Sequence, residues 1–138
     1  MTPYRITDHT ADLAIEVQGR NFPELVLHAA QGLIALLLGD AAPEATDTRL
    51  VRAAGPTRER ALVHALADML AMIEDEGEVP VSPRLADPNS DPPELAVGVV
   101  PLDVARPYLG AEIKAVTYHG LDIREERGLL SCQIVFDV

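Results

Sequence analysis

A small set of polar residues beside apolar, alternating segments could carry chemistry in this chain. Lys114 is the only lysine of the chain and lies within segment 113–119, among apolar and β-branched residues. Asp12 opens one alternating segment, and Asp137 stands near the end of another. Carboxylate oxygens are the ligands of hard divalent cations such as Ca²⁺, Mg²⁺ and Mn²⁺. Asp12, Asp137 and the terminal carboxylate of Val138 could therefore hold such a metal.

Spacing along the chain does not show that these groups converge, and each has a simpler interpretation. Scattered aspartates are the rule on protein surfaces. A lysine that faces solvent from an edge strand blocks edge-to-edge pairing of sheets, which accounts for Lys114 without a ligand. His119 follows on the same segment, and a structural role at a strand end accounts for it equally well.

Hydrophobic periodicity predicts one α+β domain over residues 1–138, with a mostly antiparallel sheet packed on two amphipathic helices. The first helix should follow an Asn21 cap, with Glu24 placed for a capping box, and end at Gly39. The second should follow a Thr57 cap and end at Gly77. Strands are expected over residues 11–18, 48–54, 79–85, 95–100, 113–119, 121–123 and 129–138. We find no internal repeat and no linker in the sequence.

The charge balance limits the classes of partner. The net charge is −11, from 22 acidic and 11 basic residues. This argues against a direct grip on nucleic-acid phosphates and fits a cation binder or a partner of a basic protein. Glu74, Asp75 and Glu76 crowd the end of the second predicted helix, where the helix dipole disfavours negative charge. The end of this helix is either exposed to solvent without a partner or part of a binding surface.

Several classes of protein are excluded by what the sequence lacks. No apolar run reaches the length of a membrane span, and the first residues do not form a signal peptide. Cys132 is the single cysteine, so no internal disulfide is possible and a reducing cytoplasm is expected. We interpret Cys132 as a small buried hydrophobe. A glycine-rich phosphate loop, a zinc-type Cys/His cluster and a nucleophile elbow are all absent.

Three segments, taken in order, resemble the archease family. Residues 9–12 (His-Thr-Ala-Asp), followed by an alternating strand, Gly19 and the Glu24-Leu25 helix, resemble its opening signature. Segment 113–119 resembles its most distinctive internal motif, and segment 134–138 resembles its terminal motif, an apolar strand that ends in Asp and one apolar residue. The resemblance spans essentially the whole chain.

The resemblance implies a function and a site. Archeases are accessory proteins of the RtcB-type, GTP-dependent RNA ligase of tRNA splicing and RNA repair. They promote its guanylylation and multiple turnover and do not seal RNA themselves. The resemblance also implies a divalent metal, Ca²⁺ foremost and Mn²⁺ or Mg²⁺ as alternatives, on Asp12, Asp137 and Val138. It makes Lys114 the functional lysine, and we add His119 as a group that orients Tyr118 or a ligand during ligase activation.

One departure and two rival functions remain. The second helix of archeases usually carries a Trp-Leu-x-Glu-Leu-like run, but Ala65 and Asp68 replace its tryptophan and glutamate, which leaves open any partner contact through that helix. One rival is a small metal-dependent phosphoesterase that uses Asp12, Asp137 and His119. The other is a general chaperone or interaction module without a metal.

Overall fold

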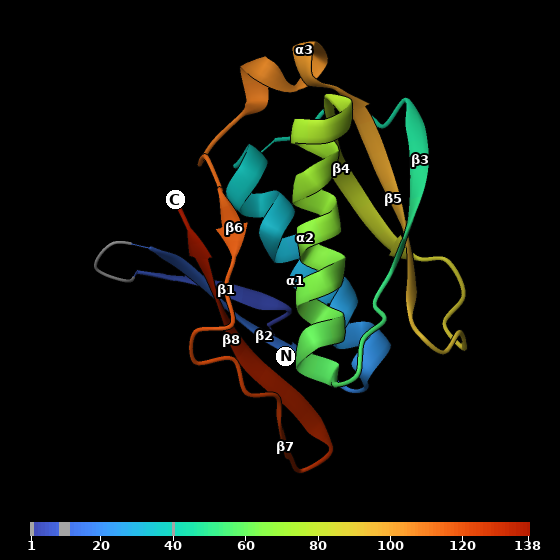
Figure 1. Cartoon of the computed structure of the whole chain (residues 1–138), viewed down its shortest axis with the longest axis vertical. Coiled ribbons are helices and arrows are strands. Elements are labelled where there is room, and N and C mark those ends of the chain that lie inside the picture. Colours follow the sequence, from blue (N-terminus) through green and yellow to red (C-terminus); the bar gives the residue numbers. More distant parts are fainter. Residues whose placement is uncertain (1, 9–11, 40) are drawn as a thin grey trace.

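Two antiparallel sheets and two long helices form this α+β domain (Figure 1), as predicted. The computed structural model describes residues 2–8, 12–39 and 41–138, so His9 of the opening signature lies outside the described residues. Helix α1 (Phe22–Leu38) packs against both sheets, and α2 (Arg58–Glu76) packs mainly against the second. Buried aliphatic side chains from all these elements join in one core. No described helix is long and apolar enough to cross a membrane.

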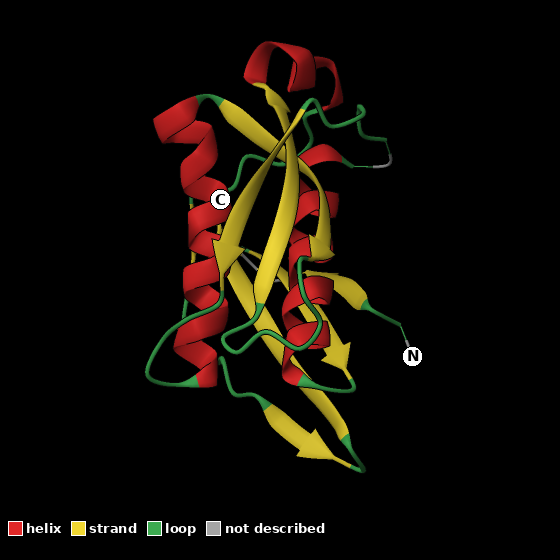
Figure 2. Cartoon of the chain, turned by 90° about the vertical axis from the view of Figure 1, so that its right-hand side faces the viewer, coloured by secondary structure: helices red, strands yellow, loops and turns green. Residues whose placement is uncertain are grey.

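The strand order separates the chain into two sheets (Figure 2), each built from antiparallel pairs. The first sheet has the order β1-β2-β8-β6, with β7 also paired to β8. The second has the order β3-β5-β4. The strands are β1 (Tyr4–Asp8), β2 (Leu13–Gly19), β3 (Asp47–Arg52), β4 (Glu78–Leu85), β5 (Glu94–Pro101), β6 (Ala115–Val116), β7 (Arg124–Glu126) and β8 (Leu129–Asp137). Strand β4 lies at an edge, as its prolines predict.

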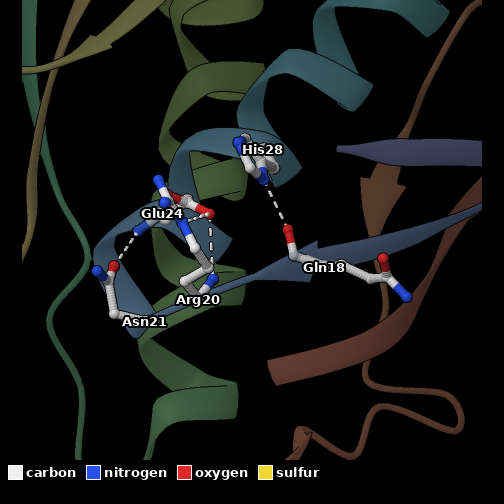
Figure 3. A network of polar contacts seen from close by, with 5 residues as sticks. All are labelled: Gln18, Arg20, Asn21, Glu24 and His28. Carbon is white, nitrogen blue, oxygen red and sulfur yellow. Dashed lines mark hydrogen bonds and ion pairs between the residues drawn. The ribbon is translucent and has the colours of Figure 1, made fainter. Parts of the chain in front are cut away.

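The junction between β2 and α1 is held by short-range polar contacts (Figure 3). The Asn21 side chain caps the helix by accepting a hydrogen bond from the Glu24 main-chain N–H at 2.9 Å. The capping box that we predicted for Glu24 is wrong, because its carboxylate accepts from the main chain and guanidinium of Arg20 instead. The His28 Nδ1 lies 2.6 Å from the Gln18 carbonyl oxygen, which ties the helix back to the strand.

The same junction recurs at the start of α2. Thr57 caps this helix, and His64 Nδ1 lies 2.9 Å from the carbonyl oxygen of Ala54. Gly55 occupies the position that Gly19 has before α1, so the glycine, the cap and the histidine follow at identical spacing. The repeat is not apparent in the sequence, because only the glycine and the histidine of the junction are identical in the two copies.

The predicted strand 113–119 is wrong in its extent, since only Ala115 and Val116 form β6. Ile113 and Val116 both pack on the core, which breaks the alternation expected along the segment. After β6, the Thr117 Oγ1 donates to the Val135 carbonyl at 3.0 Å and accepts from the His119 N–H, so the chain turns. The strand predicted over 121–123 is likewise absent, because β7 begins at Arg124.

A short helical segment between β5 and β6 was not predicted. Helix α3 (Leu102–Ala105) and one 3₁₀ turn, η1 (Arg106–Tyr108), follow β5 directly. The main-chain N–H of Gly110 then donates to the Leu37 carbonyl at the end of α1. This segment closes the end of the domain at which α1 and α2 finish.

Candidate functional site

The pairing of β2 with β8 brings Asp12 and Asp137 to the same end of the first sheet. Leu13 of β2 pairs with Phe136 of β8. The next pair on the same face, Ile15 and Ile134, is fully buried. Asp12 directly precedes Leu13, and Asp137 directly follows Phe136. Because side chains alternate along a strand, both aspartates belong to the face away from Phe136. The main chains of the two aspartates are therefore neighbours at this end.

Lys114 meets this end of the sheet from the other side of β8. Ala115 of β6 pairs with Asp137, and the Lys114 main-chain N–H donates to the Asp137 carbonyl oxygen at 2.8 Å. The Lys114 side chain is exposed and forms no ion pair with any residue that the structure describes. Val138 follows Asp137 and is also exposed. The structure thus places Asp12, Asp137, Val138 and Lys114 around one strand end.

His119 lies farther along β8 than the other predicted site residues. Both the main-chain N–H and the Oγ1 of Thr117 bind the Val135 carbonyl, and His119 follows on the exposed turn. Val135 precedes Asp137 by two residues, which is about 7 Å along a strand. Thr117 was not among the predicted site residues, and a threonine hydroxyl by itself is only a weak signal for such a turn.

The donor atoms at the strand end have the chemistry of a hard-cation site. The side chains of Asp12 and Asp137 and the main-chain carbonyl of Val138 offer oxygen only, which suits Ca²⁺, Mg²⁺ or Mn²⁺ better than zinc. Within residues 2–8, 12–39 and 41–138, no three His, Cys, Asp or Glu side chains gather as a ready ligand set. A cation held there would complete its coordination with water, as Mg²⁺ and many Ca²⁺ sites do.

Shifted pKa values occur away from this strand end and have structural causes. Hydrogen bonds from the Arg20 side chain and main chain lower the pKa of Glu24. Hydrogen bonds from Thr48 and Arg49 lower the pKa of Asp47. Burial raises the pKa of the Cys132 thiol to about 12, with a smaller contribution from Glu59. The buried Cys132 is thus the inert apolar residue that we predicted.

A groove beside the starts of the two long helices contains none of the predicted site residues. This groove has a volume of about 820 Å³ and lies between the N-terminal ends of α1 and α2 and the loop 88–93. The Arg58 guanidinium sits over the Phe22 ring there, 5.6 Å from its centre. Asn21 and Thr57, which also line the groove, each already accept a helix N–H.

Comparison with known proteins identifies the family. The model of the Archease protein family (MTH1598/TM1083) matches residues 4–138. The chain belongs to the archease family. A probable protein archease of Mycobacterium tuberculosis (strain H37Rv) is 28% identical over 136 residues, which cover 98% of this chain and 74% of that protein. A protein archease of Methanosarcina barkeri is 25% identical over 139 residues, which cover 98% of this chain and 95% of that protein.

Similar solved structures confirm the fold class. A Thermotoga maritima crystal structure, described as an archease and possible chaperone, superposes with a TM-score of 0.69 at 28% identity. The superposition covers 97% of this chain and 96% of that one. The solution structure of Methanobacterium thermoautotrophicum protein 1598 gives a TM-score of 0.77 at 24% identity over the full length of both chains and supports the fold alone.

Proposed function

We propose that this archease-family protein is an accessory factor of a GTP-dependent RtcB-type RNA ligase in tRNA splicing and RNA repair. It promotes guanylylation of the ligase and multiple turnover, and it does not join RNA itself. The observation that carries the proposal is the meeting of Asp12, Asp137 and Lys114 at one strand end in a member of this family. The Thermotoga relative, described as a possible chaperone, is compatible with a protein partner.

The residues at the strand end have separate roles in this proposal. Asp12, Asp137 and the main-chain carboxylate of Val138 bind a divalent cation, with Ca²⁺ first and Mn²⁺ or Mg²⁺ as alternatives. When bound, the cation supplies a positive charge that can stabilise phosphate oxygens. Lys114 contacts a phosphate or a ligase carboxylate as a point charge. His119, from its exposed turn farther along β8, contacts the ligase beside this centre.

The charge of the chain sets the kind of contact it can make. With a net charge of −11, it is repelled by RNA phosphates and attracted to the basic surface by which a ligase holds RNA. Opposite charges on two partners speed their association. We therefore place RNA on the ligase and assign this protein no strong nucleic-acid contact of its own.

Ligation under multiple turnover tests the proposal directly. The cognate ligase should be assayed with substoichiometric accessory protein that has an untagged C-terminus, and guanylylated ligase should be measured in the same samples. Wild type should restore turnover, whereas Lys114→Ala and Asp137→Ala should not. Leu50→Ala, a change at an exposed residue of β3, serves as the control that keeps activity. An active cognate ligase that gains nothing from wild type would refute the accessory role.

Metal titration tests the cation centre separately. Asp12→Ala, Asp137→Ala and a variant with one residue added after Val138 should each weaken Ca²⁺ binding in calorimetry. Asp68→Asn, an exposed acid on α2, should leave it unchanged. Equal affinity in all five proteins would favour the interaction module without a metal. The phosphoesterase alternative requires His119 to act together with Asp12 and Asp137. The position of His119, beyond the Thr117 turn, does not support it.

A further inference from the structure

The segment between β5 and β6 keeps large apolar side chains in solvent. Val104, Tyr108 and Leu109 are 45%, 37% and 42% exposed, and they lie in α3, at the end of η1 and directly after it. We name these three residues the α3 patch. Ala105 is the fully buried residue of this segment and fastens it to the core. A contiguous exposed apolar surface, unlike single scattered apolar residues, is typical of a protein contact.

Main-chain hydrogen bonds hold the α3 patch between the ends of the two long helices. The Leu102 N–H donates to the Gly77 carbonyl, the cap of α2, at 2.8 Å. On the far side of the patch, the Gly110 N–H donates to the Leu37 carbonyl of α1 at 2.6 Å. Figure 1 shows α3 at the tip of the molecule, above the end of α2. The patch is therefore presented on a fixed base.

The elements that meet at or lead away from this tip carry exposed acidic side chains. They are Glu74, Asp75 and Glu76 at the end of α2, Asp103 in α3, and Glu112 between η1 and β6. The only described basic partner among them is Arg106, whose Nε lies 3.1 Å from Asp103 Oδ1. The acidic crowding that the sequence showed at the end of α2 therefore borders an apolar surface. An acidic rim around an apolar centre is complementary to a basic surface with an apolar pocket.

The α3 patch lies within reach of the proposed metal and lysine centre. Segment 109–114 joins the two directly and spans at most about 18 Å even when fully extended. A standard protein interface buries about 800 Å² on each partner, which is a patch roughly 30 Å across. One partner can therefore cover both surfaces at once.

We infer that the α3 patch and its acidic rim form the docking surface for the basic, RNA-binding face of the ligase. This inference rests on the proposed function and names where that partner is held. Tyr108 and Leu109 are the apolar anchors, and the acidic rim speeds encounter. Docking through this surface places the ligase against the strand end of Asp137 and Lys114, whose contacts then serve activation.

Binding of the cognate ligase to two variants tests the inference. Tyr108→Ala/Leu109→Ala should raise the Kd at least about tenfold, as expected for paired anchor residues. Leu50→Ala, at a leucine elsewhere that is even more exposed, should bind as wild type. Glu74→Gln/Asp75→Asn/Glu76→Gln should flatten the dependence of the association rate on salt between about 50 and 200 mM. At saturating concentration the double variant should still activate the ligase, whereas Lys114→Ala should not.

The outcomes separate this inference from the proposed function. If wild type activates the ligase and the double variant binds equally well, the docking surface is wrong and the accessory role stands. If wild type neither binds nor activates, both fail. Light scattering of the protein alone supplies a third outcome, because a dimer that the double variant abolishes would assign the patch to a second copy. Thermal unfolding should show that both variants keep the wild-type fold.

Discussion

Replacing Gly19 by alanine tests how closely β2 and α1 approach each other. A Cβ at this position would lie 2.5 Å from the main-chain nitrogen of Leu25 and 2.8 Å from its Cα. Ordinary contacts begin at 3.4 Å, and main-chain atoms cannot rotate out of the way. The start of α1 would have to move by about 1 Å, in a region packed as densely as a crystal.

The loss in free energy of unfolding follows from that displacement. Overpacking a well-filled site costs about 1–3 kcal/mol, and a clash with main chain belongs at the upper end of that range. For a chain of 138 residues, unfolding entropy is about 2.1 cal/mol/K per residue, so a loss of about 3 kcal/mol lowers the Tm by about 10 °C. Scanning calorimetry and urea unfolding measure both quantities.

Two other glycines provide matched controls. Gly55 occupies the equivalent place before α2, and its added Cβ would meet the Ala61 nitrogen at 2.9 Å, so Gly55→Ala should cost about half as much. Gly120 has no atom within 4 Å of an added Cβ but has φ +66°, so Gly120→Ala should cost only about 1 kcal/mol of backbone strain. The reasoning is refuted if the Gly19→Ala protein melts no lower than the Gly120→Ala protein.

Three further predictions concern stability and reactivity. The lowered pKa of Glu24 means that its contribution is complete above pH 4.5, the ordinary value, and is lost as the pH falls through the folded pKa. Glu24→Gln should therefore make stability, followed by circular dichroism, depend less on pH in the acid range. An unchanged pH dependence would contradict this. Asn21→Ala and Thr57→Ala should each cost about 1 kcal/mol in urea unfolding by removing a helix cap. With its pKa near 12, Cys132 should react with a thiol reagent at pH 8 only after urea unfolds the chain.

Local features were predictable because the residues that determine them are close in sequence. Asn21 and Thr57 cap the two long helices, and the main strands follow their apolar alternation, as expected. The strand predicted around Lys114 was too long, because Ile113 packs on the core and the Thr117 hydroxyl bonds the Val135 carbonyl where the strand ends. Neither effect is visible in a pattern of apolar and polar residues.

The arrangement of the candidate site depends on contacts that span the chain. Asp12 and Asp137 share a strand end only because Leu13 pairs with Phe136, near the opposite ends of the sequence. Spacing alone does not predict that pairing, and the family resemblance supplied the expectation. The roles of Asp12, Asp137, Val138, Lys114 and His119 stay predictions until metal binding and ligation are measured.

The repeated junction at the starts of α1 and α2 has a consequence for the order of folding. Each copy closes within a short stretch, from Gln18 to His28 and from Ala54 to His64. Pairing of β2 with β8 must instead close nearly the whole chain, and the entropy lost grows with the length of the loop. Contacts between near neighbours form faster than such distant pairs. We therefore expect the two strand-to-helix corners to form early and independently, before the strand end that carries Asp137.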